Sequence, residues 1–129
     1  MKTKIIKAVK HYSKVMIDKD IEVKDGFEFV NCRTSSIDIV ADYELKFFVN
    51  IEYESLKKLS NSLFGFVNEE LIEDLQKELA NTIGGYFADN FFDKGYKLGL
   101  PKIEEICDTK HNVFFENDIL KLSIRLKVI

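Results

Sequence analysis

The chain reads NEELIEDLQKELANTIGGYF from Asn68 to Phe87, and this stretch decides the expected fold. Asn68 is a good helix N-cap, and the two glutamates that follow it suit the positive end of the helix dipole. Apolar residues then recur at steps of three and four, which predicts one long helix that runs to about Phe92 and ends at Lys94 and Gly95.

This helix is expected to have two distinct faces. At about 100° per residue, one arc is apolar and consists of Leu71, Ile72, Leu75, Leu79, Ile83 and Tyr86. The other arc carries Asp74, Glu78, Asn81 and Gly85. The glycine removes side-chain bulk where the backbone of another protein could approach. A polar helix face is most often just a solvated one, so the pattern by itself leaves a purely structural role open.

The spacing of Glu78 and Asn81 occurs once more in the chain, at Glu28 and Asn31. The second pair falls in a segment that we expect to be extended, where side chains three residues apart point to opposite faces. Only the pair on the helix, one turn apart, can converge on one substrate atom.

The rest of the chain completes one α+β domain over residues 1–129, with a sheet packed against helices. Helical periodicity covers residues 2–17, and Ser55 is the expected N-cap of a helix that reaches Phe64 and stops at Gly65. The β-forming runs predict strands or extended chain at residues 21–23, 27–30, 37–41, 45–53, 96–100, 103–107, 113–115 and 119–128.

Composition excludes several classes of function. Nineteen basic and 22 acidic residues give a net charge of −3 without a basic block, which argues against a nucleic-acid partner. No apolar stretch approaches the roughly 20 residues of a membrane helix, and no signal-peptide core is present, so we expect a cytoplasmic protein without a membrane partner. Cys32 and Cys107 are expected to be separate, buried or incidental thiols, and no His or Cys has metal-ligand spacing.

The stretch from Asp74 through Glu78 and Asn81 to a glycine pair, followed by a Lys-Gly break and a strand that ends in Pro101, resembles a known motif. It is similar to the D-x3-E-x2-N helix of the CheC, CheX and FliY phosphatases of bacterial chemotaxis. The resemblance is clearest over residues 68–103. CheC-type proteins carry two such helices, whereas residues 54–64 lack the pattern, so the chain resembles CheX.

The resemblance implies a CheC/CheX-like fold, in which an antiparallel-rich sheet packs against a long catalytic helix. It implies a phosphatase that removes the aspartyl phosphate of a CheY-like response regulator in two-component signalling. Asn81 would position the attacking water, Glu78 would pair with the receiver's lysine, and Asp74 and Gly85 would contribute to partner binding. No cofactor of the chain's own is implied, because the receiver supplies Mg²⁺.

The same resemblance implies a homodimer formed through sheet edges, with the terminal run from Asp118 to Ile129 as the expected edge. The alternative function is a non-catalytic module that binds a response regulator or serves in a flagellar switch. An independent small-molecule hydrolase is disfavoured, because the chain has no Ser/His/Asp set, Cys/His set or P-loop.

Overall fold

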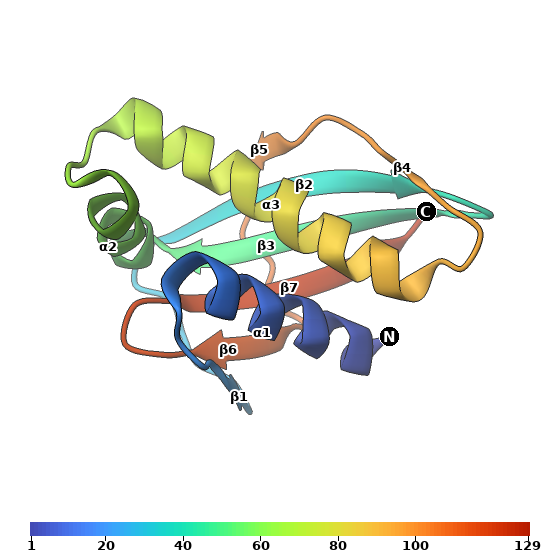
Figure 1. Cartoon of the computed structure of the whole chain (residues 1–129), viewed down its shortest axis with the longest axis horizontal. Coiled ribbons are helices and arrows are strands. Elements are labelled where there is room, and N and C mark those ends of the chain that lie inside the picture. Colours follow the sequence, from blue (N-terminus) through green and yellow to red (C-terminus); the bar gives the residue numbers. More distant parts are fainter.

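The structure is a computed structural model that describes residues 1–129, with the helices on one face of a seven-stranded antiparallel sheet (Figure 1). This confirms the predicted α+β class. The elements in chain order are α1 (Lys2–Ile17), β1 (Glu22–Lys24), β2 (Cys32–Val40), β3 (Glu44–Glu52), α2 (Tyr53–Phe64), α3 (Glu69–Phe91), β4 (Lys97–Leu98), β5 (Lys102–Glu104), β6 (Val113–Glu116) and β7 (Lys121–Val128).

The strand order is β1-β6-β7-β3-β2-β4, and β5 pairs with the same strand as β4. The strands β2 and β3 form a hairpin that is in register from Cys32 opposite Glu52 to Val40 opposite Glu44. Alternate residues of β3 face the helices and are buried; they are Leu45, Phe47, Val49 and Ile51. These residues join the inner faces of the helices in one apolar core.

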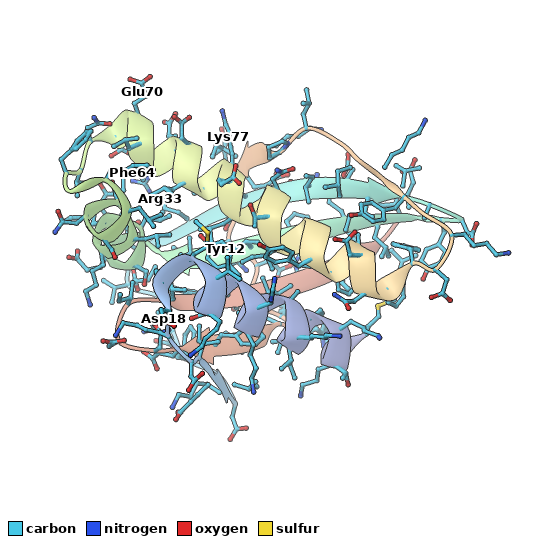
Figure 2. All side chains as sticks on the ribbon, in the orientation of Figure 1. Tyr12, Asp18, Arg33, Phe64, Glu70 and Lys77 are labelled. Atoms are coloured by element: carbon cyan, nitrogen blue, oxygen red, sulfur yellow. A yellow bond between two sulfur atoms is a disulfide. The ribbon has the colours of Figure 1, made fainter.

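The helix α1 spans the predicted residues and lies beside α3 (Figure 1). Tyr12 belongs to its buried face and lies between the two helices (Figure 2). None of the three helices combines the length and the apolar composition that crossing a membrane requires.

The start of α2 differs from the prediction, because Glu52 rather than Ser55 caps the helix. The Glu52 carboxylate accepts hydrogen bonds from the backbone N–H groups of Val30 at 2.7 Å and Asn31 at 2.8 Å, and from Tyr53 at 3.2 Å. The two carboxylate oxygens of Glu52 thus accept hydrogen bonds both from the segment before β2 and from the first turn of α2. Ser55 lies inside that turn, where its hydroxyl accepts a hydrogen bond from the N–H of Lys121 at 2.9 Å.

The helix α3 begins as predicted, with the Asn68 side chain accepting a hydrogen bond from the Leu71 N–H at 2.8 Å. Its buried arc is wider than the predicted apolar arc, because Gln76, Ala80 and Gly84 are also buried. The small residues allow the helix to lie close to the sheet. The Gln76 side chain donates a hydrogen bond to the carbonyl oxygen of Thr34 at 3.0 Å, which offsets the burial of its amide.

The edges of the sheet agree with the prediction only in part. The terminal run was expected at an edge, but the first half of β7 is covered on both sides, because β3 pairs with Leu122–Val128 and β6 pairs with Lys121–Ile124. Residues 125–128 are unpaired on the side of β6, and the other free edges are β1 and, beyond β2, the short strands β4 and β5. Pairing order depends on contacts between distant segments, which the β-forming character of residues 119–128 does not reveal.

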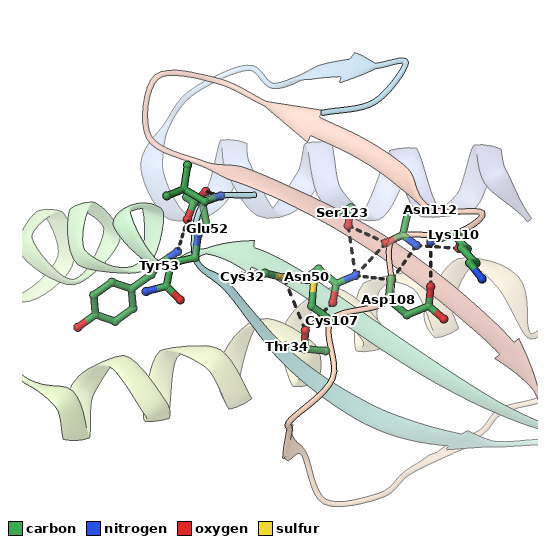
Figure 3. The surroundings of a disulfide bond; sticks show 12 residues. Cys32, Thr34, Asn50, Glu52, Tyr53, Cys107, Asp108, Lys110, Asn112 and Ser123 are labelled. Atoms are coloured by element: carbon green, nitrogen blue, oxygen red, sulfur yellow. Dashed lines mark hydrogen bonds between the residues drawn. A yellow bond between two sulfur atoms is a disulfide. The ribbon is translucent and has the colours of Figure 1, made fainter. Parts of the chain in front are cut away.

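The second face of the sheet carries a polar cluster centred on Asn50, which is fully buried (Figure 3). The Asn50 carboxamide accepts a hydrogen bond from the Thr34 hydroxyl at 2.6 Å and donates to the Asn112 side chain at 2.9 Å and the Asp108 carbonyl oxygen at 3.0 Å. Ser123 donates to the Asn112 side chain at 2.6 Å. This cluster fastens the segment after β5 to the sheet.

Cys32 and Cys107 form a disulfide beside this cluster (Figure 3). The expectation of two separate thiols is therefore wrong. The cysteines are 75 residues apart in sequence, and they meet because β5 pairs with β2 and carries the following segment across the sheet. The residues next to Cys32 and Cys107 in the sequence do not indicate that the two cysteines lie close together in the fold.

Candidate functional site

The four candidate residues lie on the side of α3 that faces away from the core. Asp74 and Glu78 are exposed, and Asn81 and Gly85 are half-buried. The spacing of three and four residues places them in one row along the helix. They lie in the interior of a 23-residue helix, so its backbone hydrogen bonds fix their positions. We call these four residues the α3 ridge.

Glu78 accepts a hydrogen bond from the Thr82 hydroxyl at 2.6 Å, one turn further along α3. It forms no ion pair with any Lys or Arg of the chain. One carboxylate oxygen is therefore oriented by Thr82, while the negative charge is left without a counter-ion. The sequence motif did not single out Thr82, although the separation of four residues is the signal that could have found it.

Tyr12 of α1 lies between α1 and α3 (Figure 2) and is almost completely buried. Its hydroxyl has no hydrogen-bond partner. Burial raises the pKa of Tyr12, and the negative charge of Glu78 raises it further. Tyr12 is thus a neutral phenol beside the α3 ridge, and only the packing of α1 on α3 brings it there.

Asn81 has no side-chain hydrogen bond to any other residue of the chain, although it is half-buried. The two neighbouring amides on the same helix contrast with it. Gln76 donates to the Thr34 carbonyl oxygen, and Asn90 donates to the Tyr86 carbonyl oxygen at 2.8 Å. The Asn81 carboxamide alone keeps both its donor and its acceptor for an external group.

Gly85 lies beneath β4, where an added Cβ would stand 3.6 Å from Leu98 Cδ1. The Tyr96 hydroxyl donates its proton to the Asp89 carboxylate, and its oxygen lies 3.4 Å from the Gly85 carbonyl oxygen. This bond to Asp89 raises the pKa of Tyr96 to about 12. The chain's own residues therefore flank this end of the α3 ridge.

The opposite flank of the α3 ridge is formed by α1. His11 and Tyr86 meet there edge to face, with ring centroids 4.5 Å apart. The exposed carboxylates and the carboxamide thus lie on a helix surface that α1 flanks on one side and β4 on the other. No group of three or more His, Cys, Asp or Glu side chains could hold a metal ion. Such a surface can reach into the site of another protein.

No protein-family model and no curated protein matches the sequence. Solved structures do match. The CheX chain in the CheX-CheY-BeF3-Mg²⁺ complex from Borrelia burgdorferi is 13% identical, with a TM-score of 0.74 over 98% of this chain and 96% of that one. Chemotaxis protein CheX from Desulfovibrio desulfuricans is 11% identical, with a TM-score of 0.71 over 98% of this chain and 97% of that one.

A third similar structure is the FliM middle domain from Vibrio alginolyticus, which is 9% identical, with a TM-score of 0.59 over 98% of this chain and 90% of that one. Together the likenesses define the fold class as that of the CheX and CheC-like chemotaxis proteins. The chain has a CheX-like fold along nearly its whole length. The predicted fold is thereby confirmed.

Proposed function

We propose that this protein is a phosphatase that hydrolyses the aspartyl phosphate of a CheY-like response regulator. The observation that supports this most is Asn81, a half-buried and unpartnered carboxamide in mid-helix beside an unpaired Glu78, on a CheX-like fold. A structure of the same fold that contains CheX with CheY and BeF3 supports the choice of partner.

Asn81 would act on water in the receiver's phosphorylation site. Its carboxamide has one oxygen acceptor and two N–H donors, so it can hold a water molecule in line with phosphorus. Water attacks phosphorus, the bond between phosphorus and the aspartate oxygen breaks, and the products are a free aspartate and inorganic phosphate. The Mg²⁺ of such a site belongs to the receiver, where it neutralises phosphoryl charge.

Glu78 would dock the helix by pairing with a receiver lysine. The hydrogen bond from Thr82 holds the carboxylate at a fixed height along α3, one turn before Asn81. An ion pair at that point sets the depth to which Asn81 enters. Asp74, one turn earlier and also without an ion pair, would add to the attraction, and Gly85 would allow close approach at the other end.

The test is the decay of phosphorylated receivers from the same organism, with Mg²⁺ and catalytic amounts of the protein. Asn81→Ala should lower the rate by roughly 10²–10⁴-fold, because the variant loses the group that positions the nucleophile. Asn61→Ala is a matched control, since Asn61 is an exposed helical asparagine on α2. Equal rates for the two variants would refute the role of Asn81.

The alternative is a module that binds a receiver without hydrolysing its phosphate. The likeness to the FliM middle domain supports this alternative. A module of this kind should bind phosphorylated receiver more tightly than unphosphorylated receiver and leave the decay rate unchanged. The phosphatase should instead accelerate decay at concentrations far below that of the receiver.

A homodimer is part of the same proposal. A dimer formed by strand addition would use β1, the β4 and β5 edge, or residues 125–128 of β7, which are unpaired on the side of β6. Sedimentation equilibrium measures the mass in solution. A mass equal to one chain at all concentrations would remove the dimer from the proposal.

A further inference from the structure

An apolar pocket of about 200 Å³ adjoins the α3 ridge where the end of α2 meets α3. Phe64, Leu71 and Leu75 supply its apolar walls, and Asp74 and Glu78 complete its lining. Phe64 is the last residue of α2 (Figure 2), and 50% of it is exposed. Leu75, in contrast, is a core residue. The pocket is therefore bounded on one side by the buried Leu75 and on another by the half-exposed ring of Phe64.

We infer that this pocket receives an aliphatic side chain of the receiver domain, with a lysine or arginine beside it that pairs with Asp74. The inference rests on the proposed function, since it names a second contact for the same partner. Receiver recognition would then have two points, a polar one on α3 at Glu78 and Asn81 and an apolar one where α2 meets α3, at Phe64 and Leu71.

Continuity with the α3 ridge argues for this occupant. Glu78 belongs both to the ridge and to the lining of the pocket. A partner that pairs with the Glu78 carboxylate must cover the space beside it, so the same protein has to fill or bridge the pocket. Half-exposed aromatic side chains at such positions are frequent anchors of protein interfaces, because binding removes their remaining apolar surface from water.

Charge complementarity points to the basic neighbour. Asp74 is exposed, and no lysine or arginine of this chain pairs with Asp74 or Glu78. Two unpaired carboxylates beside an apolar pocket repel an acidic partner surface and attract one that offers two cations. One cation is assigned to Glu78 under the proposed function, which leaves Asp74 for the second.

The test compares two variants with two matched controls. Phe64→Ser changes the pocket wall, whereas Phe66→Ser changes a phenylalanine of similar exposure, 55%, that does not line the pocket. Asp74→Lys reverses a lining charge, whereas Glu73→Lys reverses an exposed charge one residue away that is not part of the lining. All four positions are half-exposed or exposed, so the fold should persist, and circular dichroism of each variant checks this.

Each variant is assayed with the receiver that the protein dephosphorylates, and its binding to BeF3-treated receivers is measured in the Asn81→Ala background, which needs no turnover. Phe64→Ser and Asp74→Lys should raise KM and the dissociation constant roughly tenfold, with kcat within about twofold of wild type. The two controls should change neither constant. The loss with Asp74→Lys should shrink at high salt.

The inference is overturned if Phe64→Ser and Asp74→Lys bind the receiver as tightly as their controls while Asn81→Ala still abolishes turnover. The proposed function fails separately, if Asn81→Ala leaves turnover unchanged or if no receiver decays faster. If the proposed function fails, the measurement of binding to BeF3-treated receivers still tests whether the pocket binds a receiver. Binding that is lost in Phe64→Ser supports the pocket, and unchanged binding or no binding to any receiver rejects it.

Discussion

Gly84 lies so close to Ile37 that a Cβ on residue 84 would stand 2.8 Å from Ile37 Cγ2. Ile37 is buried in β2, and its Cγ2 is too near the backbone to swing away. Gly84→Ala should therefore destabilise the fold by about 1–3 kcal/mol, the typical cost of overpacking. The roughly 1 kcal/mol that alanine gains over glycine in a helix offsets part of that cost.

Gly85→Ala is the matched control for this prediction. Its Cβ would be in ordinary contact with Leu98, so helix propensity should leave the variant at wild-type stability or slightly above. Urea unfolding of both variants measures the difference. Equal midpoints for the two alanine variants would contradict the close packing of α3 on β2.

Thr82→Val removes the hydroxyl that orients the Glu78 carboxylate. In the wild type this hydrogen bond already orders the Glu78 side chain. In the variant the side chain would become ordered only when the receiver binds, and this ordering makes binding less favourable by about 0.5–1.5 kcal/mol. Receiver binding should weaken by roughly two- to tenfold, and Thr82→Ser, which keeps the hydroxyl, should restore it. Titration of a receiver with each variant measures this, and tight binding by Thr82→Val would show that Glu78 needs no support.

Reduction of the Cys32–Cys107 disulfide should lower the free energy of unfolding by about 2–4 kcal/mol, because the unfolded chain regains freedom. Urea unfolding with and without dithiothreitol measures the loss. A variant with both cysteines changed to serine should match the reduced protein and should not respond to dithiothreitol. A response in that variant would mean that the reductant acts elsewhere.

Glu104 should make stability depend on pH. A hydrogen bond from the Ser36 hydroxyl, at 2.6 Å, and the nearby Lys46 ammonium hold the pKa of Glu104 below its ordinary value, although burial opposes them. Its stabilisation is therefore complete above the pKa of an unfolded-state glutamate, about 4.3, and is lost as the pH falls through the lower folded-state pKa.

Glu104→Gln should consequently destabilise the protein more at pH 7 than at pH 3. Glu105→Gln is the control, because Glu105 is exposed and forms no hydrogen bond or ion pair through its side chain. Thermal unfolding across this pH range compares the two. A loss in Glu104→Gln that does not vary with pH would indicate that the carboxylate charge contributes nothing.

Local patterns were sufficient for the helices and for most strands. The Asn68 cap and the helical periodicity after it depend on residues within a few positions of each other, so they were predictable. The separation of the α3 ridge from the core was predictable for the same reason. Its roles in binding and hydrolysis stay predictions.

Features that depend on distant contacts could not be predicted. The position of β7 between β6 and β3 and the burial of Tyr12 between α1 and α3 (Figure 2) follow from how separate elements pair and pack. The burial of Gln76 in α3 could not be predicted, because its hydrogen-bond partner, Thr34, lies on β2, which is distant in sequence. Glu52 rather than Ser55 caps α2, because the Glu52 carboxylate accepts hydrogen bonds from three backbone N–H groups at once.

The disulfide has one more consequence, which concerns the topology of the covalent chain. Cys32 and Cys107 close a ring that contains α2, α3 and the strands β2 to β5 almost entirely. Residues 93–95, which join α3 to β4, are exposed and lie within this ring. A single proteolytic cut there opens the ring into a linear crosslinked chain. The nicked protein keeps its mass on a non-reducing gel and separates into two fragments only after reduction.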